Sequence, residues 1–168
     1  MSQTVSGILT IRFDPVSQAH FESMRQRRFP PERNLVPAHL TLFHVLPVSE
    51  EICSTLTAIA STTQVFPIDV TGLRSLGRGV AYSLAGPELH SVHRLLSFSF
   101  AALLHPQDKQ KFRPHVVIQN KSTESQAGEL LSALQASFQA FTVQAQGLDL
   151  WHYRDGPWEL ATQFDFIV

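Results

Sequence analysis

A histidine and a threonine at the start of an apolar segment give this chain its first candidate for chemistry. The segment "PAHLTLFHVLP" covers residues 37–47 and reads as a strand, in which alternate residues share a face. His39, Thr41 and Phe43 are therefore expected on one face. The opposite, core-facing set is Leu40, Leu42, His44 and Leu46. An imidazole and a hydroxyl about 7 Å apart along a strand can bind one phosphate-sized anion together.

A second histidine begins a comparable segment, "RPHVVIQN", at residues 113–120. His115, Val117 and Gln119 share one predicted face, and Val116 and Ile118 form the apolar face. The position two residues after this histidine is Val117, so the second segment has no hydroxyl to match Thr41.

Two opposed imidazoles suit displacement at phosphorus. The attacking and leaving oxygens lie in line, so a neutral histidine can accept a proton from one while a protonated histidine donates to the other. The ordinary histidine pKa of about 6.5 lets both forms coexist near neutral pH. This scheme needs no metal ion and no other cofactor.

The elements expected to position these histidines follow one another twice in the same order. A strand at 5–13 precedes a helix from Pro15 to about Arg28, which Asp14 caps. The remaining expected elements are a strand at 39–46, a helix capped by Ser49, strands at 64–75 and 79–85, a helix at 87–104, a strand at 115–120, a helix at 122–138, and a hairpin of 141–153 with 156–168.

This order predicts an α+β fold with a weak internal duplication. We expect one domain over 1–168, made of two pseudo-symmetric lobes that cover roughly 5–85 and 79–168 and share strands. The lobes would contribute two mainly antiparallel sheets flanking a central groove, with the helices outside.

Composition excludes several classes of protein. The 168 residues carry a formal net charge of −1, which does not favour the binding of long duplex DNA. Cys53 is the single cysteine, so an internal disulfide or a cysteine-based zinc site is excluded. With no signal peptide and no apolar run of membrane-spanning length, we expect a cytoplasmic monomer without membrane contact.

The pair "HLTL" at 39–42 and "HVVI" at 115–118 resembles the paired HxT motifs of the 2H phosphoesterase superfamily, in particular its 2′-5′ RNA ligase-like, or cyclic phosphodiesterase, branch. The resemblance covers nearly the whole chain. It implies a bilobal α+β fold and metal-free hydrolysis or formation of phosphodiester bonds at RNA ends or in small cyclic nucleotides. His39, Thr41 and His115 match the catalytic positions, and Val117 departs from the motif.

Two functions follow from this comparison. One is a metal-independent phosphodiesterase acting on 2′,3′-cyclic phosphates or 2′-5′ phosphodiester bonds. The other is a nucleotide or RNA-end binding module, because loss of one phosphate donor at Val117 slows such an enzyme by about 10²–10³-fold. A mononuclear metal hydrolase built on His39 and His115 has no evident third ligand.

Basic segments precede both histidine strands and are candidates for steering a phosphate substrate. They contain Arg25, Arg27, Arg28 and Arg33 before the first strand, and Lys109, Lys111 and Arg113 before the second. Arg113, two residues before His115, is the best single candidate. The aromatic residues that are candidates to line the groove and stack on a base are Phe43, Tyr82, Trp151 and Tyr153, with core packing as the alternative role for each. The i,i+3 pair His90 and His93 is better explained by helix packing or exposure than by a metal site.

Overall fold

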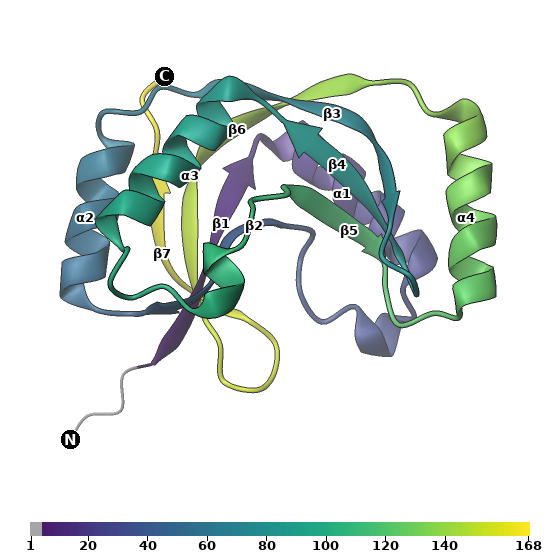
Figure 1. Ribbon diagram of the computed structural model, residues 1–168, viewed down its shortest axis with the longest axis horizontal. Helices are drawn as coiled ribbons and strands as arrows, with labels where there is room; N and C mark the ends of the chain where they lie inside the picture. Colours follow the sequence, from purple (N-terminus) through teal and green to yellow (C-terminus); the bar gives the residue numbers. More distant parts are fainter. Residues whose placement is uncertain (1–4) are drawn as a thin grey trace.

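All named strands of the protein pair antiparallel within one sheet. The computed structural model describes residues 5–168. Its elements are β1 (Ser6–Phe13), α1 (Pro15–Arg28), η1 (Pro31–Arg33), β2 (Leu40–Pro47), α2 (Glu50–Ala60), β3 (Phe66–Ser75), β4 (Val80–Ala85), α3 (Pro87–Ser99), η2 (Pro106–Lys109), β5 (His115–Gln119), α4 (Glu124–Ser137), β6 (Phe141–His152) and β7 (Glu159–Asp165). The α+β class is confirmed (Figure 1).

The sheet closes on itself through β6. Its order is β1-β2-β5-β4-β3-β6-β7, and β6 also pairs with β1. The expectation of two separate sheets is therefore wrong. The physical reason is the length of β6: its Phe141–Ala145 half pairs with β3, and its Ala145–His152 half pairs with β1. One continuous strand thus belongs to both halves of the sheet.

Local signals in the sequence explain where the helices begin. The Asp14 carboxylate accepts a hydrogen bond from the Ser17 amide at 3.1 Å, and Pro15 occupies the first turn. Ser49 caps α2 in the same way, and Thr123 forms a capping box with Gln126 at the start of α4. Helix α3 ends at Ser99, whereas the sequence predicted a helix that continues to residue 104.

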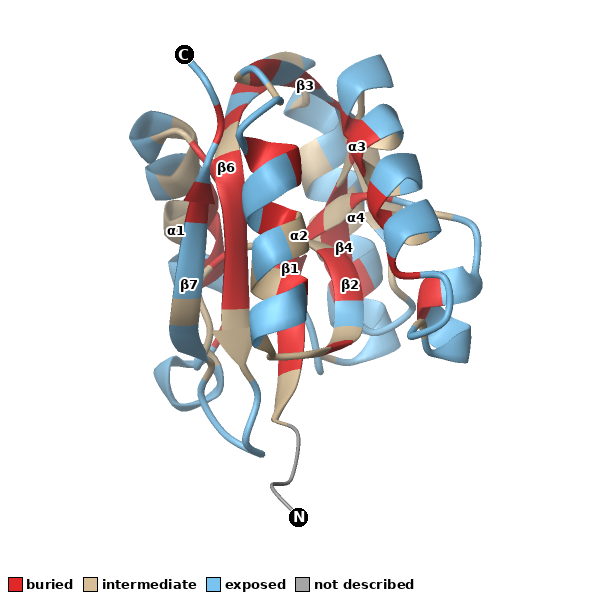
Figure 2. Ribbon diagram, turned by 90° about the vertical axis from the view of Figure 1, so that its left-hand side faces the viewer, coloured by how far each residue is buried: buried red, intermediate tan, exposed pale blue. Residues whose placement is uncertain are grey.

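The helices cover two different parts of the outer face of the sheet. Helices α1 and α4 pack against β5, β3 and β4, whereas α2 and α3 pack against β7, β6 and β3. Figure 2 shows the exposed outer sides of α2 and α3 over buried strands. Among residues 5–168, no helix combines the length and apolar character needed to cross a membrane.

Candidate active site

A single residue pair joins the two histidine strands. Leu40 of β2 lies opposite Val116 of β5, and both are fully buried. Antiparallel pairing at this point sets Thr41 beside His115, and His39 beside Val117, on the other face of the sheet. Both histidines predicted from the sequence therefore lie at one seam.

The two imidazoles are anchored in the same way. Nδ1 of His39 lies 2.8 Å from the Pro37 carbonyl oxygen, and Nδ1 of His115 lies 2.8 Å from the Arg113 carbonyl oxygen. A carbonyl oxygen only accepts, so Nδ1 donates and carries the proton of the neutral ring in each case. Nε2 of each histidine is left with a lone pair to accept a proton from a reacting group.

Burial favours the neutral form of both imidazoles. It lowers the pKa of His39 from 6.5 to about 4, with further lowering by the nearby charges of Arg25, His115 and His44. Burial also lowers the pKa of His115 below 6.5, and the positive charge of Arg74 acts in the same direction. The bond to the backbone carbonyl partly opposes the effect at each ring.

Two irregularities in β2 change which of its residues face the core. The pairing of β2 with β1 shifts by one residue between Leu9 and Thr10 of β1, and again between Gly7 and Leu9. Such bulges reset the alternation of faces. The buried core residues of β2 are therefore Leu40, Leu42, Phe43 and Leu46, and the two consecutive ones, Leu42 and Phe43, lie at the bulged part of the strand.

These bulges correct two expectations. Phe43 does not share the face of His39; it lies in the core, where its ring stacks on His93 at 5.0 Å between centroids. His44, expected at the core margin, instead lines the same pocket as Thr41 and His115, and 44% of its side chain is exposed.

Asp108 of η2 holds the bulged part of β2 in place. Its carboxylate accepts hydrogen bonds from the backbone amides of His44 at 2.9 Å and Val45 at 3.1 Å. It also lies 2.9 Å from Nδ1 of His44. This carboxylate therefore satisfies backbone donors that the bulge leaves without strand partners, and it orients the third imidazole of the site.

The pocket beside His115 has a volume of about 330 Å³ and a basic lining. Arg74 of β3, Lys111 and Arg113 line it with Thr41, His44 and His115. Arg113 was predicted, whereas Arg74 comes from a strand distant in sequence and was missed. Three cations around a hydroxyl and two imidazoles form a site suited to a phosphate group.

His39 lines a different pocket, of about 350 Å³, whose lining does not include His115. The ring of Trp158 lies over the His39 imidazole with 4.4 Å between centroids. Trp151, also in contact with Trp158, lines this pocket and donates from Nε1 to the Thr10 hydroxyl at 3.0 Å. Flat aromatic surfaces therefore adjoin His39, while charged groups surround His115.

Comparison with known proteins identifies the family of this site. Residues 13–157 match the model of the 2'-5' RNA ligase superfamily. The chain belongs to this superfamily. No curated protein sequence gives a match.

Solved structures of phosphoesterases share the fold of this superfamily member. LigT of E. coli in its apo form superposes with a TM-score of 0.64 at 16% identity, covering 99% of this chain and 100% of LigT. TT0787 of Thermus thermophilus gives 0.60 at 14% identity, covering 96% and 97% of the two chains. LigT complexed with 3'-AMP gives 0.59 at 16% identity and covers 98% and 99%.

Val117 is where this 2H phosphoesterase departs from the paired motif. The backbone of this residue is bound by a buried cation: Nη1 of Arg25 donates to the Val117 carbonyl oxygen at 2.9 Å. Arg25 is only 3% exposed and stacks on Phe29, so it is not an exposed residue that steers a phosphate substrate, the role for which the sequence made it a candidate. Its positive charge contributes to the lowered pKa of His39.

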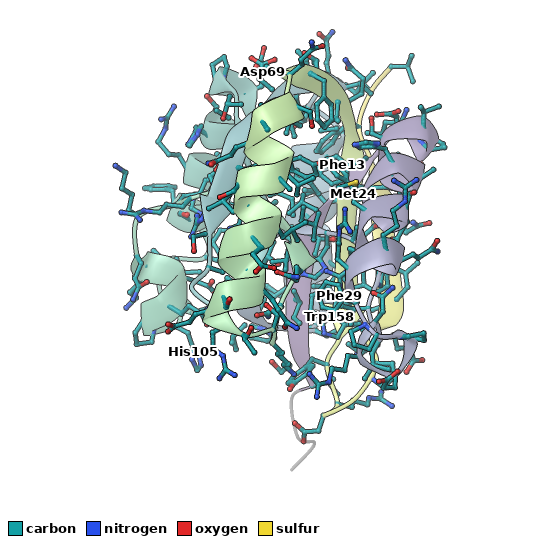
Figure 3. All side chains as sticks on the ribbon, turned by 90° about the vertical axis from the view of Figure 1, so that its right-hand side faces the viewer. Phe13, Met24, Phe29, Asp69, His105 and Trp158 are labelled. Carbon is teal, nitrogen blue, oxygen red and sulfur yellow. The ribbon has the colours of Figure 1, made fainter. Side chains whose placement is uncertain are left out.

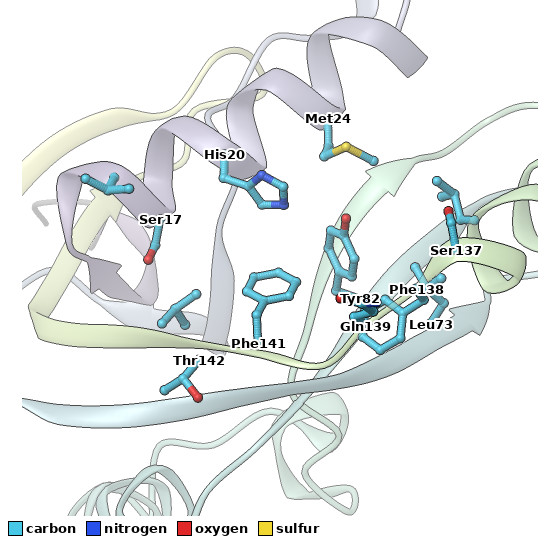
Figure 4. A pocket seen from close by; sticks show the side chains of 13 residues that line it. Ser17, His20, Met24, Leu73, Tyr82, Ser137, Phe138, Gln139, Phe141 and Thr142 are labelled. Carbon is cyan, nitrogen blue, oxygen red and sulfur yellow. The ribbon is translucent and has the colours of Figure 1, made fainter.

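The predicted tyrosines do not lie beside the histidines. Val80, Tyr82 and Leu84 alternate toward the helices, whereas Ser83 pairs with His115 on the other face. Tyr82 accordingly lines a pocket of about 570 Å³ between α1 and α4, close to His20 and Phe141 (Figure 4). Tyr153 is exposed and lies outside the two pockets at the seam.

His93 has a packing role, as the sequence favoured. Its ring stacks on Phe112 with 3.8 Å between centroids as well as on Phe43. Burial lowers its pKa to about 4. Within residues 5–168, no three side chains of histidine, cysteine, aspartate or glutamate form a group that could hold a metal ion.

Proposed function

We propose that the protein is a metal-independent phosphodiesterase of RNA ends or small nucleotides, acting on 2′,3′-cyclic phosphates or 2′-5′ phosphodiester bonds. The observation that carries this proposal is the matched anchoring of His39 and His115, which leaves Nε2 of both rings available at one seam. Family membership and the nucleotides named in structures of LigT, 3'-AMP, ATP and NADP+, support the choice of substrate class.

The chemistry requires one proton transfer at each imidazole. In hydrolysis of a cyclic phosphate, one neutral histidine accepts a proton from water as its oxygen bonds to phosphorus. The bond from phosphorus to one ribose oxygen breaks, and the other, protonated histidine donates to that oxygen. Thr41 and Arg74 contribute a hydroxyl and a positive charge to the phosphate oxygens.

Arg74 is proposed to replace part of what Val117 lacks. It lies across from Ala81, and Ala81 lies across from Val117, so its side chain extends over the same face as both histidines. A guanidinium offers charge as well as hydrogen-bond donors to a phosphate. The presence of Arg74 favours the enzyme over the binding module, although a guanidinium does not reproduce the hydroxyl that is missing next to His39.

The test of this function is hydrolysis of a nucleoside 2′,3′-cyclic phosphate in the presence of a chelator. We expect turnover by the unmodified protein, and Val117→Thr should raise kcat by about tenfold or more because one transition-state donor is restored. Retained nucleotide binding with no turnover in either form would favour the module instead. Turnover that depends on added metal ions would contradict the proposed mechanism.

The pH dependence of kcat/KM should be bell-shaped with its maximum below pH 6.5. The reaction needs one neutral and one protonated imidazole, and kcat/KM reports the pKa values of the free enzyme. Activity therefore rises as pH increases through about 4, where His39 loses its proton. It falls as pH increases through the lowered pKa of His115.

Arg74→Gln provides the matched control for this profile. Because the Arg74 charge lowers the pKa of His115, its removal should move the falling limb to higher pH while leaving the rising limb in place. A maximum above pH 7 in the unmodified enzyme, or no displacement in the variant, would contradict the proposed pair.

A further inference from the structure

A second basic pocket lies at the far end of β5, away from His115. Its volume is about 420 Å³. It is formed by the end of α1, by η1 and by the turn between β5 and α4. The lining residues that carry the argument are Arg27, Arg28, Arg33, Gln119, Lys121 and Ser122.

The four cations of this pocket, Arg27, Arg28, Arg33 and Lys121, are exposed and not neutralised by carboxylates. Within the described part of the chain, ion pairs closer than 4.0 Å involve only Arg12 and His44. Glu32 and Glu124 are the acidic residues next to the pocket in sequence, and neither forms such a pair. For a chain of net charge −1, this is a marked local excess of positive charge.

Hydrogen bonds hold the walls of the pocket together. Nη1 of Arg33 donates to the Lys121 carbonyl oxygen at 3.3 Å, which ties η1 to the turn after β5. Nε of Arg78 donates to the Ser122 carbonyl oxygen at 3.0 Å. Gly79 has no room for a side chain because the Gln119 backbone lies against it. The turn is therefore fixed before any ligand binds.

One strand connects this pocket to the histidine seam. His115 begins β5 and Gln119 ends it, which places the two about 13 Å apart along the strand. His115, Val117 and Gln119 are the half-buried residues of β5, and a register shift against β4 lies between Val117 and Gln119. In Figure 1, β5 runs from the centre of the molecule toward the corner where α1 ends and α4 begins. Figure 3 shows Phe29 and Trp158 at the same end of the molecule, opposite Asp69.

We propose that this second pocket binds an internal phosphate of an RNA chain whose cyclic-phosphate end lies between His39 and His115. The inference rests on the proposed function and narrows its substrate class from RNA ends or small nucleotides to the ends of oligoribonucleotides. Phosphates recur along a single strand, so a chain lying along β5 presents one charge to each site. Positive grooves that follow the backbone are the usual means of binding single strands.

The experiment compares substrates of increasing length. Hydrolysis is measured for a nucleoside 2′,3′-cyclic phosphate and for oligoribonucleotides of increasing length with the same end. For the unmodified protein, kcat/KM should rise at the length that first reaches the second pocket. The double variant Arg27→Gln/Arg28→Gln should lower kcat/KM about tenfold or more for the long substrates, and leave the mononucleotide within about twofold. Arg94→Gln, an exposed arginine on α3, is the matched control and should change neither.

Salt dependence and binding give readouts that do not require catalysis. An oligoribonucleotide with a 3′-hydroxyl end should bind the unmodified protein. The slope of log K against log salt should lose about 0.7 for each phosphate contact that the double variant removes. If no cyclic phosphate is hydrolysed but this binding is lost in the variant, the proposed function fails and the RNA site stands. The RNA site would be overturned if kcat/KM were the same for substrates of every length, or if Arg94→Gln lowered kcat/KM as much as the double variant does. Binding of polyglutamate as tight as that of the oligoribonucleotide would also overturn it.

Discussion

Replacing His39 or His115 by alanine should lower kcat for a nucleoside 2′,3′-cyclic phosphate by about 10²–10⁴-fold, the range that a general acid or base contributes. Each imidazole presents one Nε2 to the seam because its Nδ1 is occupied by a backbone carbonyl. The measurement is turnover in the presence of a chelator, with thermal unfolding of each variant to check that it folds.

Two controls make this result interpretable. His105→Ala removes an exposed histidine at the start of η2 and should leave kcat unchanged. The double variant of His39 and His115 should lose little more activity than either single variant, because residues that act as a unit have non-additive effects. Undiminished turnover in either single variant would exclude the paired mechanism. Multiplicative losses would show that the two histidines contribute independently.

Asp108→Ala should lower the free energy of unfolding by about 3–5 kcal/mol, the largest effect on stability expected from a single polar side chain near the site. The Asp108 side chain is 2% exposed. Its loss leaves the amides of His44 and Val45 without an acceptor in the bulged part of β2. Urea denaturation measures the change.

The control for this effect is Glu129→Ala, which removes an exposed carboxylate from α4 and should change stability by less than about 0.5 kcal/mol. Asp108→Asn keeps one acceptor oxygen, so its loss in free energy of unfolding should lie between those of Asp108→Ala and Glu129→Ala. Asp108→Ala should also reduce kcat/KM, since η2 fixes the segment that leads to Arg113 and His115. Equal stability of Asp108→Ala and Glu129→Ala would mean that the bulge does not depend on this carboxylate.

The sequence was most informative where its signals are local. The predicted caps at Asp14 and Ser49 have side chains that accept hydrogen bonds from amides three positions later, so their effect can be predicted from neighbouring residues. The alternation in β5 likewise predicted the face that His115 shares with Val117. The α+β class follows from the order of such elements.

The errors arose where distant segments decide the outcome. Strict alternation assigned Phe43 to the groove, but Asp108 stabilises a bulge that turns it into the core. Arg74 and Trp158 reach the histidines from strands and loops far away in sequence, and no local pattern indicates this. The two expected sheets proved to be one because β6 is long enough to pair on both sides of the junction.

The closed sheet restricts how the protein can change shape around a substrate. In the ring β6-β1-β2-β5-β4-β3, the boundary between β2 and β5 lies on the side away from β6. That boundary consists of the single pair Leu40 and Val116, whereas β6 is one unbroken strand. Parting the sheet at the β2–β5 boundary would break one residue pair, whereas parting it at the neighbouring boundaries would break several. His39 and His115 flank this boundary, so the junction of the closed sheet with the fewest residue pairs coincides with its two imidazoles.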